Sequence, residues 1–519
     1  MRTARVRRAN DRPPNPKGRY VLYWPQMFRR LHSNHALDHA LALAAEHKKP
    51  LVVYEGLKLD YPWACARHHT FILQGMRDNA AAAKKLGVSY WPFVETPDDD
   101  GRSRVRKLAA DAVCVVTDDY PAFIVPAHNR ALAAKCDVPL ILVDGNSVVP
   151  LALLGEPVAA AAHLRPRIHK LFAAAWEHRA AHEPAVPKVA RGRIDPPFEP
   201  WDAKQNIARF VAALPIDQSV PPVPGAEGGT VAGCAALDEF VSDKLPNYAD
   251  GRNEPNAPAR TAASRLSPYL HYGHVSIQEV AEAVLGAKWS PKLVNARTRN
   301  KDDFFCRDPN ANDFLDEAIT WRDVGYHWNF MRIAGDRAAP GNGRNVSWMT
   351  PIPTNVPCFN FESMDFSPGG ERTLDAVLPD WARTTLRKHA RDRREHVYAL
   401  EEFEAAATHD ELWNAAQKEL VATGRVHNYL RMLWGKKVLE WSESPADAYR
   451  VLEHLNNKYA LDGRDPNSYT GVLWCFGLFD RPWPPERKVF GTVRYMSSDS
   501  TAKKFDLDGY YEYVDALPT

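Results

Sequence analysis

The feature that most constrains the fold is an alternation of strand-like and helix-like patterns over roughly the first 150 residues. Short apolar runs rich in β-branched and aromatic residues occur at residues 20–24, 51–54, 88–94, 112–117 and 139–144. Helical patterns lie between them, such as residues 35–46, which follow the capping residue Asn34, and residues 67–86. Strands that alternate with helices imply a parallel sheet covered by helices on both faces. The sequence therefore predicts an α/β fold with a doubly wound parallel sheet.

The rest of the chain changes character twice. Prolines cluster at residues 196–200 and 219–224, so we expect residues 173–236 to be an extended connection between domains. From residue 237 the patterns are mostly helical, which predicts an all-α domain over residues 237–519. The α/β domain then takes residues 19–172, and residues 1–18 are expected to be a disordered basic arm.

A second irregular tract, at residues 334–370, is rich in Pro, Gly and Asn. A loop of that length in a compact domain is usually functional or disordered. Residues 383–395 are dense in Arg and Lys. They form either a solvated helix face or a patch that contacts phosphates, and composition does not separate the two.

Cysteine spacing and hydropathy exclude several classes of protein. The seven cysteines are widely scattered and form no C-x-x-C pair, which argues against a disulfide framework and against a zinc site. No apolar run reaches about 18 residues, and the basic start has no apolar signal core, so we expect neither a membrane span nor a signal peptide. These features predict a cytoplasmic protein without a bound metal. The net charge of +2 gives no indication about nucleic acid.

A helical tract at residues 427–441 carries two tryptophans seven residues apart, Trp434 and Trp441. Seven residues are close to two helical turns, so both indoles project from one face at a separation of roughly 10 Å. Rings at that spacing are more often part of a packed core. The alternative is a series of stepping stones for electron transfer, and the spacing alone leaves both open.

These residues, with the stretch 412–417 upstream, resemble the flavin-binding domain of the photolyase/cryptochrome family, specifically its class II cyclobutane pyrimidine dimer photolyases. The resemblance runs from about residue 20 to the carboxyl end, with gaps at the linker and at residues 334–370. It implies an amino-terminal antenna domain followed by a helical FAD-binding domain. The segment YVLYWPQ at residues 20–26 is similar to the class II start of that antenna domain.

The resemblance also implies how FAD is bound. The string SRLSPYLHYG, which begins at Ser264, is similar to the segment that holds the pyrophosphate, although two serines at a helix start are ordinarily N-caps. The pair formed by Arg431 and Asp462 is expected beside the isoalloxazine ring, and Asn456 near flavin N5. The residues assigned to FAD are Tyr248, Ser264, Arg265, Leu266, Ser267, Asn428, Arg431, Asn456, Asp462, Gly463 and Asn467.

A lesion pocket is implied by four further residues. Glu317 and Trp321 are four residues apart on a helix predicted at residues 314–322, so they share a face. In the family the matching acid hydrogen-bonds the base edges of a flipped-out dimer, and the matching indole packs against it. Met432 and Trp474 complete this pocket. After Asp323, residues 324–330 depart from the commoner class II pattern, which indicates a divergent branch.

Trp413, Trp434 and Trp441 match the electron-transfer tryptophans of class II members. The function implied is light-driven repair, in which excited reduced FAD donates an electron to the dimer. The alternative is a cryptochrome-like blue-light photoreceptor with the same fold and flavin. The resemblance further implies double-stranded DNA containing pyrimidine dimers as the partner, a monomer, and an antenna chromophore of the deazaflavin or folate type beside FAD.

Overall fold

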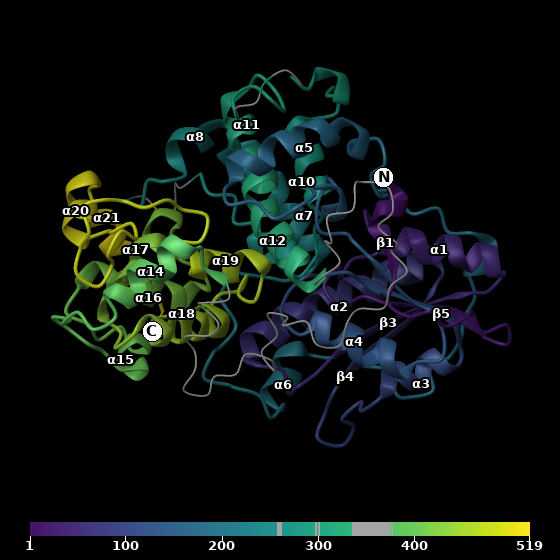
Figure 1. Cartoon of the computed structure of the whole chain (residues 1–519). Coiled ribbons are helices and arrows are strands. Elements are labelled where there is room, and N and C mark those ends of the chain that lie inside the picture. The colour runs from purple at the N-terminus through teal and green to yellow at the C-terminus, as the bar shows by residue number, and fades with distance from the viewer. Residues whose placement is uncertain (257–261, 296–297, 299–300, 335–373, 375–376, 519) are drawn as a thin grey trace. The chain divides into compact units, whose positions relative to one another are not determined.

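The structure is a computed structural model that describes residues 1–518 except 257–261, 296–297, 299–300, 335–373 and 375–376 (Figure 1). The chain divides into two compact units. The first contains Met1–Val158, Leu164–Val241 and Arg265–Ser363, and the second contains Ala159–His163, Ser242–Ser264 and Met364–Thr519. Apart from Ala334, the irregular tract expected at residues 334–370 lies outside the described residues.

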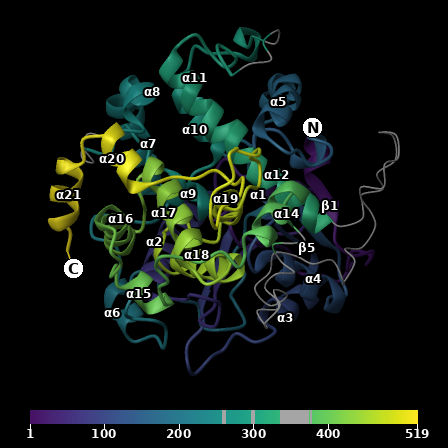
Figure 2. The same cartoon turned by 60° about the vertical axis from the view of Figure 1, so that its left-hand side comes forward.

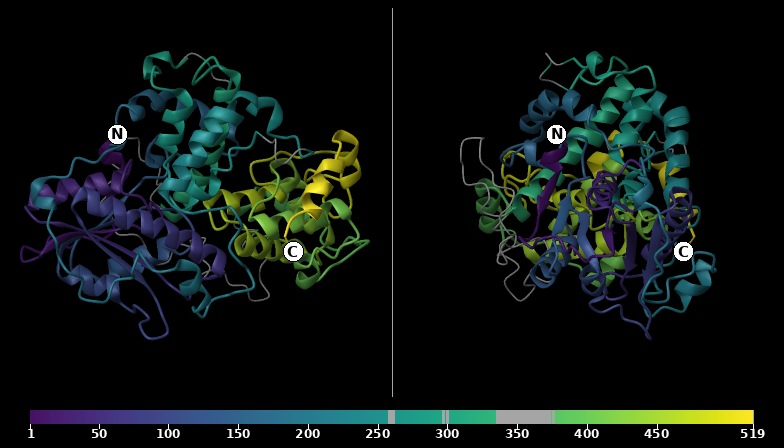
Figure 3. Two further views of the ribbon diagram at one scale, coloured as in Figure 1. Left: turned by 180° about the vertical axis from the view of Figure 1, so that it is seen from behind. Right: turned by 90° about the vertical axis from the view of Figure 1, so that its right-hand side faces the viewer.

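The first unit is built on a six-stranded sheet (Figures 1 and 3). Its strands are β1 (Val6–Arg8), β2 (Tyr20–Trp24), β3 (Leu51–Leu57), β4 (Ser89–Val94), β5 (Ala112–Asp118) and β6 (Leu140–Val143). They lie in the order β1-β6-β5-β2-β3-β4, and only β1 is antiparallel to its neighbour. All five predicted strands are present, so the predicted α/β fold is confirmed.

Helices cover both faces of this sheet. They are α1 (His35–His47), α2 (Ala66–Leu86), α3 (Arg104–Ala110) and α4 (Val125–Lys135). Successive side chains of a strand point to opposite faces. Val21 of β2 accordingly packs in one core cluster with Leu37 of α1. Its neighbour Leu22 packs in another cluster with Leu108 of α3 and Leu132 of α4. The sheet is therefore doubly wound.

A local signal fixes the start of α1. The side-chain oxygen of Asn34 accepts hydrogen bonds from the backbone N–H groups of Ala36 and Leu37, at 2.9 and 3.2 Å. These groups have no partner inside the helix, and an asparagine at the N-cap satisfies them. The capping role predicted for Asn34 is confirmed.

The amino-terminal arm is not disordered, and this prediction is wrong. Val6–Arg8 forms an edge strand on β6. The buried Arg5 guanidinium donates to the carbonyl groups of Asp144, Ser147 and Val148, and Arg7 forms a buried ion pair with Asp119. These partners lie more than 100 residues away in the chain, so a local reading of a basic segment does not reveal them.

The predicted connection at residues 173–236 contains short helices and returns to the sheet. Its helices are α6 (Ile207–Ala212) and α7 (Thr230–Glu239), and α5 (Ala161–Trp176) extends into it. Trp91 of β4 donates its indole N–H to the Ile194 carbonyl, and the backbone N–H of Trp201 donates to the Pro92 carbonyl. This segment therefore covers edge strand β4, which would otherwise expose unpaired backbone groups. The compact units do not divide at residues 172 and 236.

The first unit also contains part of the predicted helical region. Its elements there are α9 (Ser267–His271), α10 (Ile277–Leu285), α11 (Pro309–Leu315), the π-helix η8 (Asp316–Trp321) and α12 (Arg322–Ala334). The prediction of helices in this region is confirmed by these elements.

The described elements of the second unit are helical (Figure 2). They include α8 (Tyr248–Gly251), α14 (Asp380–Lys388), α15 (Leu400–Glu404), α16 (Glu411–Thr423), α17 (Asn428–Trp441), α18 (Pro445–Tyr459), α19 (Pro466–Cys475), α20 (Ser498–Lys504) and α21 (Asp508–Asp515). Helix α17 packs against α16, α18 and α19. Among the described helices of the chain, none is both long enough and apolar enough to cross a membrane.

Candidate functional site

Three predicted electron-transfer tryptophans meet inside the second unit. Trp413 on α16 lies between the two indoles of α17, with ring centroids 6.5 Å from Trp434 and 6.0 Å from Trp441. The planes of Trp413 and Trp434 are parallel to within 4°. All three residues are buried. The two indoles that the sequence places about two turns apart are thus bridged by a third ring from another helix.

Hydrogen bonds fix the orientation of two of these rings. The Trp413 indole N–H donates to the backbone carbonyl of Trp434 at 3.0 Å. The Trp434 indole N–H donates to Gln417 Oε1, also at 3.0 Å, and Gln417 is fully buried. Buried indole N–H groups usually find such a partner. The tryptophans are consequently both core packing and a continuous series of closely spaced rings.

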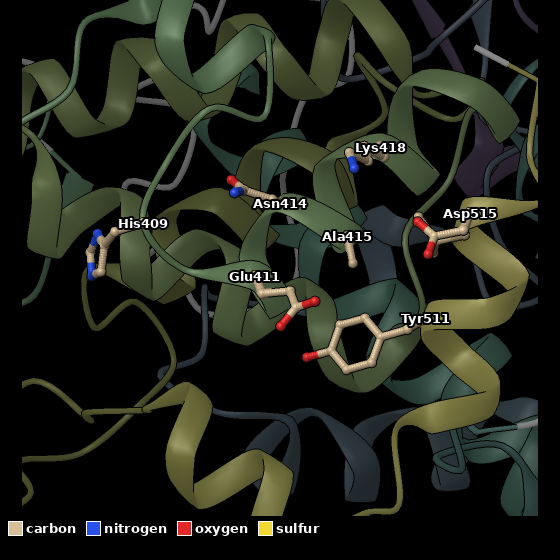
Figure 4. A pocket seen from close by; sticks show the side chains of 8 residues that line it. His409, Glu411, Asn414, Ala415, Lys418, Tyr511 and Asp515 are labelled. Atoms are coloured by element: carbon tan, nitrogen blue, oxygen red, sulfur yellow. The ribbon is translucent and has the colours of Figure 1, made fainter.

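The series reaches the surface beyond Trp441. The Trp441 ring lies 5.0 Å from the ring of His409 and 5.8 Å from that of Tyr398. The Tyr398 hydroxyl and His409 Nδ1 are 2.6 Å apart. His409 is exposed and lines a small surface pocket (Figure 4).

This pocket has a volume of about 200 Å³. Its lining residues are His409, Glu411, Asn414, Ala415, Lys418, Tyr511, Val514 and Asp515. Drug-sized ligands occupy pockets of roughly 300–1,000 Å³, so this one is too small for a dinucleotide. None of the residues expected to bind FAD lines it.

Several residues of the second unit that are expected around the flavin or the dimer are at least partly exposed to solvent. Arg431 and Asn428 of α17 are exposed, and Met432, Asn456, Asp462, Asn467 and Trp474 are half-buried. Their immediate neighbours in sequence, such as Leu430 and Leu433, are buried. The polar and aromatic positions that the sequence assigns to a ligand are therefore the accessible ones on these helices.

The turn between α18 and α19 has a shape that depends on glycine. A Cβ atom on Gly463 would lie 2.7 Å from the carbonyl oxygen of Asn456 and 3.0 Å from the Asn457 Cα. The next residue, Arg464, has φ +68°. Asp465 then caps α19 by accepting from the N–H of Asn467 at 2.8 Å. Only glycine allows the chain to approach the end of α18 so closely.

The expected pair of Arg431 and Asp462 is not formed, which corrects that prediction. In the described part of the chain no ion pair within 4.0 Å joins them. Burial raises the pKa of Glu419 and lowers the pKa of His427 to about 4, and the nearby charge of Arg431 opposes the first shift and adds to the second. An exposed guanidinium remains hydrated, so burial does not force it to pair.

Three of the residues assigned to FAD lie at helix starts. Tyr248 is buried and opens α8 in the second unit, and Asn428 opens α17, where its side-chain amide donates to Asn253 at 3.0 Å. Ser267 is the first residue of α9, and the capping position before it is the buried Leu266, without a side-chain cap bond. The ordinary capping role for Ser267 is therefore not observed.

Two other residues of the 264–267 string differ from ordinary exposed helix residues in backbone conformation or burial. Arg265 has φ +57°, a left-handed conformation, and Ser264 is half-buried. The string crosses the division between the two compact units, after Ser264.

Glu317 and Trp321 lie on a π-helix, whereas an α-helix was expected. Their shared segment, η8, is wound with i→i+5 hydrogen bonds, a rare conformation that is frequent at functional sites. Both side chains are half-buried. Between them, Thr320 is buried, and on the inner side Asp316 forms two hydrogen bonds with Arg165 of α5, at 3.0 and 2.9 Å. The inner bonds hold the turn while Glu317 and Trp321 stay accessible.

Asp323 contacts the α/β part of the first unit. It is fully buried, and the Ser147 hydroxyl donates to its Oδ1 at 2.5 Å. Burial raises the pKa of Asp323 to about 7, and the nearby Arg322 offsets part of that rise. The divergent residues 324–330 are buried as well. Their difference from the commoner pattern therefore concerns packing within this unit.

Groups of three or more His, Cys, Asp or Glu that would hold a metal ion do not occur among the described residues.

Comparison with known proteins gives the family. Curated relatives match along nearly the whole chain: the deoxyribodipyrimidine photo-lyase of Methanothermobacter thermautotrophicus is 33% identical over 517 residues, covering 99% of this chain and 98% of that protein. The chain belongs to the deoxyribodipyrimidine photo-lyase family. The family member from Oryza sativa subsp. japonica is 33% identical, with 96% and 88% covered, and that from Potorous tridactylus is 31% identical, with 94% and 79% covered.

Solved structures agree on the fold of this photo-lyase family member. A class III photolyase from Agrobacterium tumefaciens gives a TM-score of 0.59 at 18% identity, covering 96% of this chain and 86% of that one. A Synechocystis cryptochrome gives 0.57 at 14% identity, covering 95% and 88%. Such identities show the fold alone. A scan of protein-family models gives no match.

Several residues of this photo-lyase family member were not found by sequence reasoning. Gln417 orients Trp434, and its role depends on a contact between two helices that joins residues 17 positions apart in the chain. Tyr398 and His409 extend the aromatic series, yet neither carries a sequence signal by itself. Asp316 directly precedes Glu317 and supports the π-helix. In the sequence, two adjacent acidic residues give no sign that one of them is buried and paired with an arginine.

Proposed function

We propose that this protein binds FAD and uses light to split cyclobutane pyrimidine dimers in DNA. The observation that carries the proposal is the buried series of three tryptophans in a chain related along its whole length to curated deoxyribodipyrimidine photo-lyases. Three neighbouring buried indoles that lead to the exposed His409 suit stepwise electron transfer.

The residues assigned to FAD fit a flavin nucleotide. Polar side chains on α17 and in the turn before α19 are accessible, and this turn packs so closely on the end of α18 that a Cβ atom on Gly463 would clash with backbone atoms. Arg431 supplies a cation, Asn456 an amide and Asp462 a carboxylate toward the ring system, while Tyr248 and the 264–267 string would contact the phosphates. FAD, when bound, supplies the light absorption and the one-electron chemistry.

The protein's part in reloading the cofactor is electron delivery. Trp434 lies two residues after Met432 and three after Arg431 on α17, so the inner end of the series belongs to the helix that is assigned to the flavin. Trp413 and Trp441 then provide two further short hops toward the exposed His409. Short hops between easily oxidised rings replace one long tunnelling step.

The protein's part in repair is to hold a flipped-out dimer. Glu317 would hydrogen-bond the base edges, and Trp321, Met432 and Trp474 would form the apolar wall that stacks against the bases. The partner is double-stranded DNA containing such dimers, contacted mainly through phosphates and therefore salt-sensitive. Basic residues at 383–395 are candidates for those contacts; a single copy of the chain suffices for this site.

Two narrower assignments accompany this proposal. An antenna chromophore of the deazaflavin or folate type would bind to the α/β part, as the family resemblance implies. None of the six described cysteines forms a disulfide, in keeping with action in a reducing cytoplasm.

A repair assay with matched variants tests the proposal. Purified protein is expected to show flavin absorption or to take it up from added FAD, and pre-reduced enzyme is expected to repair dimer-containing DNA under blue light. Glu317→Gln is expected to keep FAD and photoreduction but to lose roughly ten-fold or more in repair, because the amide nitrogen that replaces one carboxylate oxygen cannot accept a hydrogen bond, and a mispaired group in a desolvated pocket costs about 1–3 kcal/mol. Asp313→Asn, one turn earlier on α11 and paired with Lys301, is the control and is expected to repair normally.

The outcomes separate the candidate functions. Absence of flavin uptake by folded protein would refute the proposal altogether. Flavin binding and photoreduction without any dimer repair by the parent protein would favour the cryptochrome-like photoreceptor. Equal repair by Glu317→Gln and the parent protein would remove Glu317 from the lesion pocket.

A further inference from the structure

Three polar side chains form a row on the buried face of α18. Tyr449, Glu453 and Asn457 follow one another at intervals of four residues, so they lie one turn apart on the same face. Each is 3% exposed or less. The Tyr449 hydroxyl, one Glu453 carboxyl oxygen and the Asn457 side-chain N–H group each lack a hydrogen bond of good geometry. Buried polar groups of this kind require an explanation.

The charge state of Glu453 follows from its surroundings. In the described part of the chain no Lys, Arg or His forms an ion pair with it. A carboxylate without a cation or water is costly to bury, so the neutral acid is favoured. Burial raises the pKa of Glu453 to about 8, and the neighbouring Tyr449 hydroxyl offsets part of that rise.

Among the described residues, the elements packed against α18 supply no cation that pairs with Glu453. From α15, Glu404 is paired with His454 and Lys458 of α18. From α17, the buried Lys436 donates to the carbonyl of Cys475 at 2.6 Å.

On the α19 side, the Tyr469 hydroxyl faces the row and interacts with Asn457. Arg464 and Asp465, in the turn before α19, act on Tyr469 with opposite signs. Around Glu453, therefore, the facing groups are neutral dipoles rather than cations.

The row ends at the turn assigned to the flavin. Asn457 Oδ1 accepts from the backbone N–H of Arg464 at 2.9 Å and from the side-chain amide of Asn456 at 3.1 Å. Gly463 lies against the Asn457 Cα in the same turn. The position of Asn457 thus sets both the orientation of Asn456 and the path of the chain through Asp462 to Arg464.

We propose that Glu453, as a neutral carboxylic acid, is a positioning residue: through the neighbouring Tyr469, which contacts Asn457, it holds the 460–465 turn in the shape that binds FAD. Ionisation of Glu453 places an unpaired charge beside this turn and lowers flavin affinity. The inference rests on the proposed function, since it assigns Asn456 and Asp462 to the flavin. It adds that the protonation state of Glu453, a residue not assigned to the cofactor, controls flavin affinity.

The test is the pH dependence of FAD affinity, measured with the full chain by flavin fluorescence between pH 7 and 9. If only the neutral form is competent, the apparent Kd of the parent protein rises by roughly ten-fold at pH 9, because the competent fraction falls by that factor. Glu453→Gln, which is neutral at every pH, is expected to bind FAD normally at pH 7 and to lose this rise. Glu443→Gln, at an exposed position just before α18, is expected to keep it.

A second measurement is thermal unfolding without FAD. Because the pKa of Glu453 is higher in the folded than in the unfolded state, the parent protein loses stability as pH rises from about 4.5 to about 8. Glu453→Gln is expected to lose less over that window and to be the more stable protein at pH 8. Glu453→Met serves the same comparison if the glutamine variant does not fold.

The results discriminate clearly. A parent protein whose FAD affinity is the same at pH 7 and 9, or a rise that persists unchanged in Glu453→Gln, overturns the inference. A parent protein that does not bind FAD even at pH 7 overturns the proposed function instead.

Discussion

Replacing Trp434 by Phe separates electron transfer from packing. The indole N–H of Trp434 donates to Gln417 Oε1 at 3.0 Å in a fully buried setting. Phenylalanine keeps an aromatic ring but removes this donor. The Gln417 side-chain amide nitrogen has no hydrogen-bond partner of its own in the structure, so the variant leaves the whole amide unpaired.

The expected cost can be worked from that contact. A buried polar group that loses its partner destabilises by about 1–3 kcal/mol, which should appear as a lower urea midpoint for unfolding. Photoreduction of oxidised flavin should be abolished, because Trp413 is then separated from the inner end of the series. Repair by chemically pre-reduced protein should persist, since Trp434 does not belong to the lesion pocket.

The double variant Trp434→Phe with Gln417→Leu is the decisive control. Replacing both partners by apolar groups removes the unpaired amide and should recover most of the lost stability. Photoreduction should stay abolished. Recovery of photoreduction together with stability would show that Trp434 acts only as a packing residue, and normal photoreduction in Trp434→Phe alone would refute the proposed series.

Three further predictions concern buried charges. Asp316→Ala should lower the free energy of unfolding in urea by about 3–5 kcal/mol, because it leaves the buried Arg165 guanidinium without its carboxylate partner. The double variant Arg165→Met with Asp316→Leu should have a stability much closer to that of the parent protein. Asp323→Asn should reduce the loss of thermal stability between about pH 4 and 7, because the parent pKa rises from 3.8 to about 7 on folding; an unchanged slope would argue against burial of this acid. The parent protein should gain stability as pH rises from about 8 to about 10.5, because burial lowers the pKa of Lys436 from 10.5 to about 8 in the folded state. Lys436→Met should remove this gain, which thermal melts across that pH range would measure.

The sheet could be predicted because its signals are local. An apolar run such as residues 112–117 predicts a strand, and a capping residue such as Asn34 predicts a helix start, each from a few neighbouring residues. The arm at residues 1–18 was misjudged for the opposite reason. Arg5 and Arg7 are held by carbonyl groups and a carboxylate that lie far away in sequence. Whether a basic segment is ordered depends on such distant partners, which the segment's own sequence does not reveal.

The sequence indicates candidate members of a site but not their geometry. The spacing of Trp434 and Trp441 indicates a shared face, yet it gives no sign that Trp413 fills the space between them. Likewise, four residues between Glu317 and Trp321 suggest an α-helix. Their π-helix depends on tertiary contacts, among them the bond from Arg165 to Asp316, that sequence spacing does not contain.

Asn456 and Asn457 show why residue type alone cannot assign a role in this site. The two are adjacent and identical, but one step along an α-helix turns a side chain by roughly 100°. Asn456 is therefore half-buried on the accessible side, while Asn457 is 1% exposed and joins the row that contains Glu453. The hydrogen bond between the two side chains couples the accessible site to the buried row. A substitution at Asn457 should thus alter flavin affinity as strongly as one at Asn456, although only Asn456 is assigned to the flavin. Asn457→Ala with unchanged FAD affinity would break this coupling and leave the buried row a matter of stability alone.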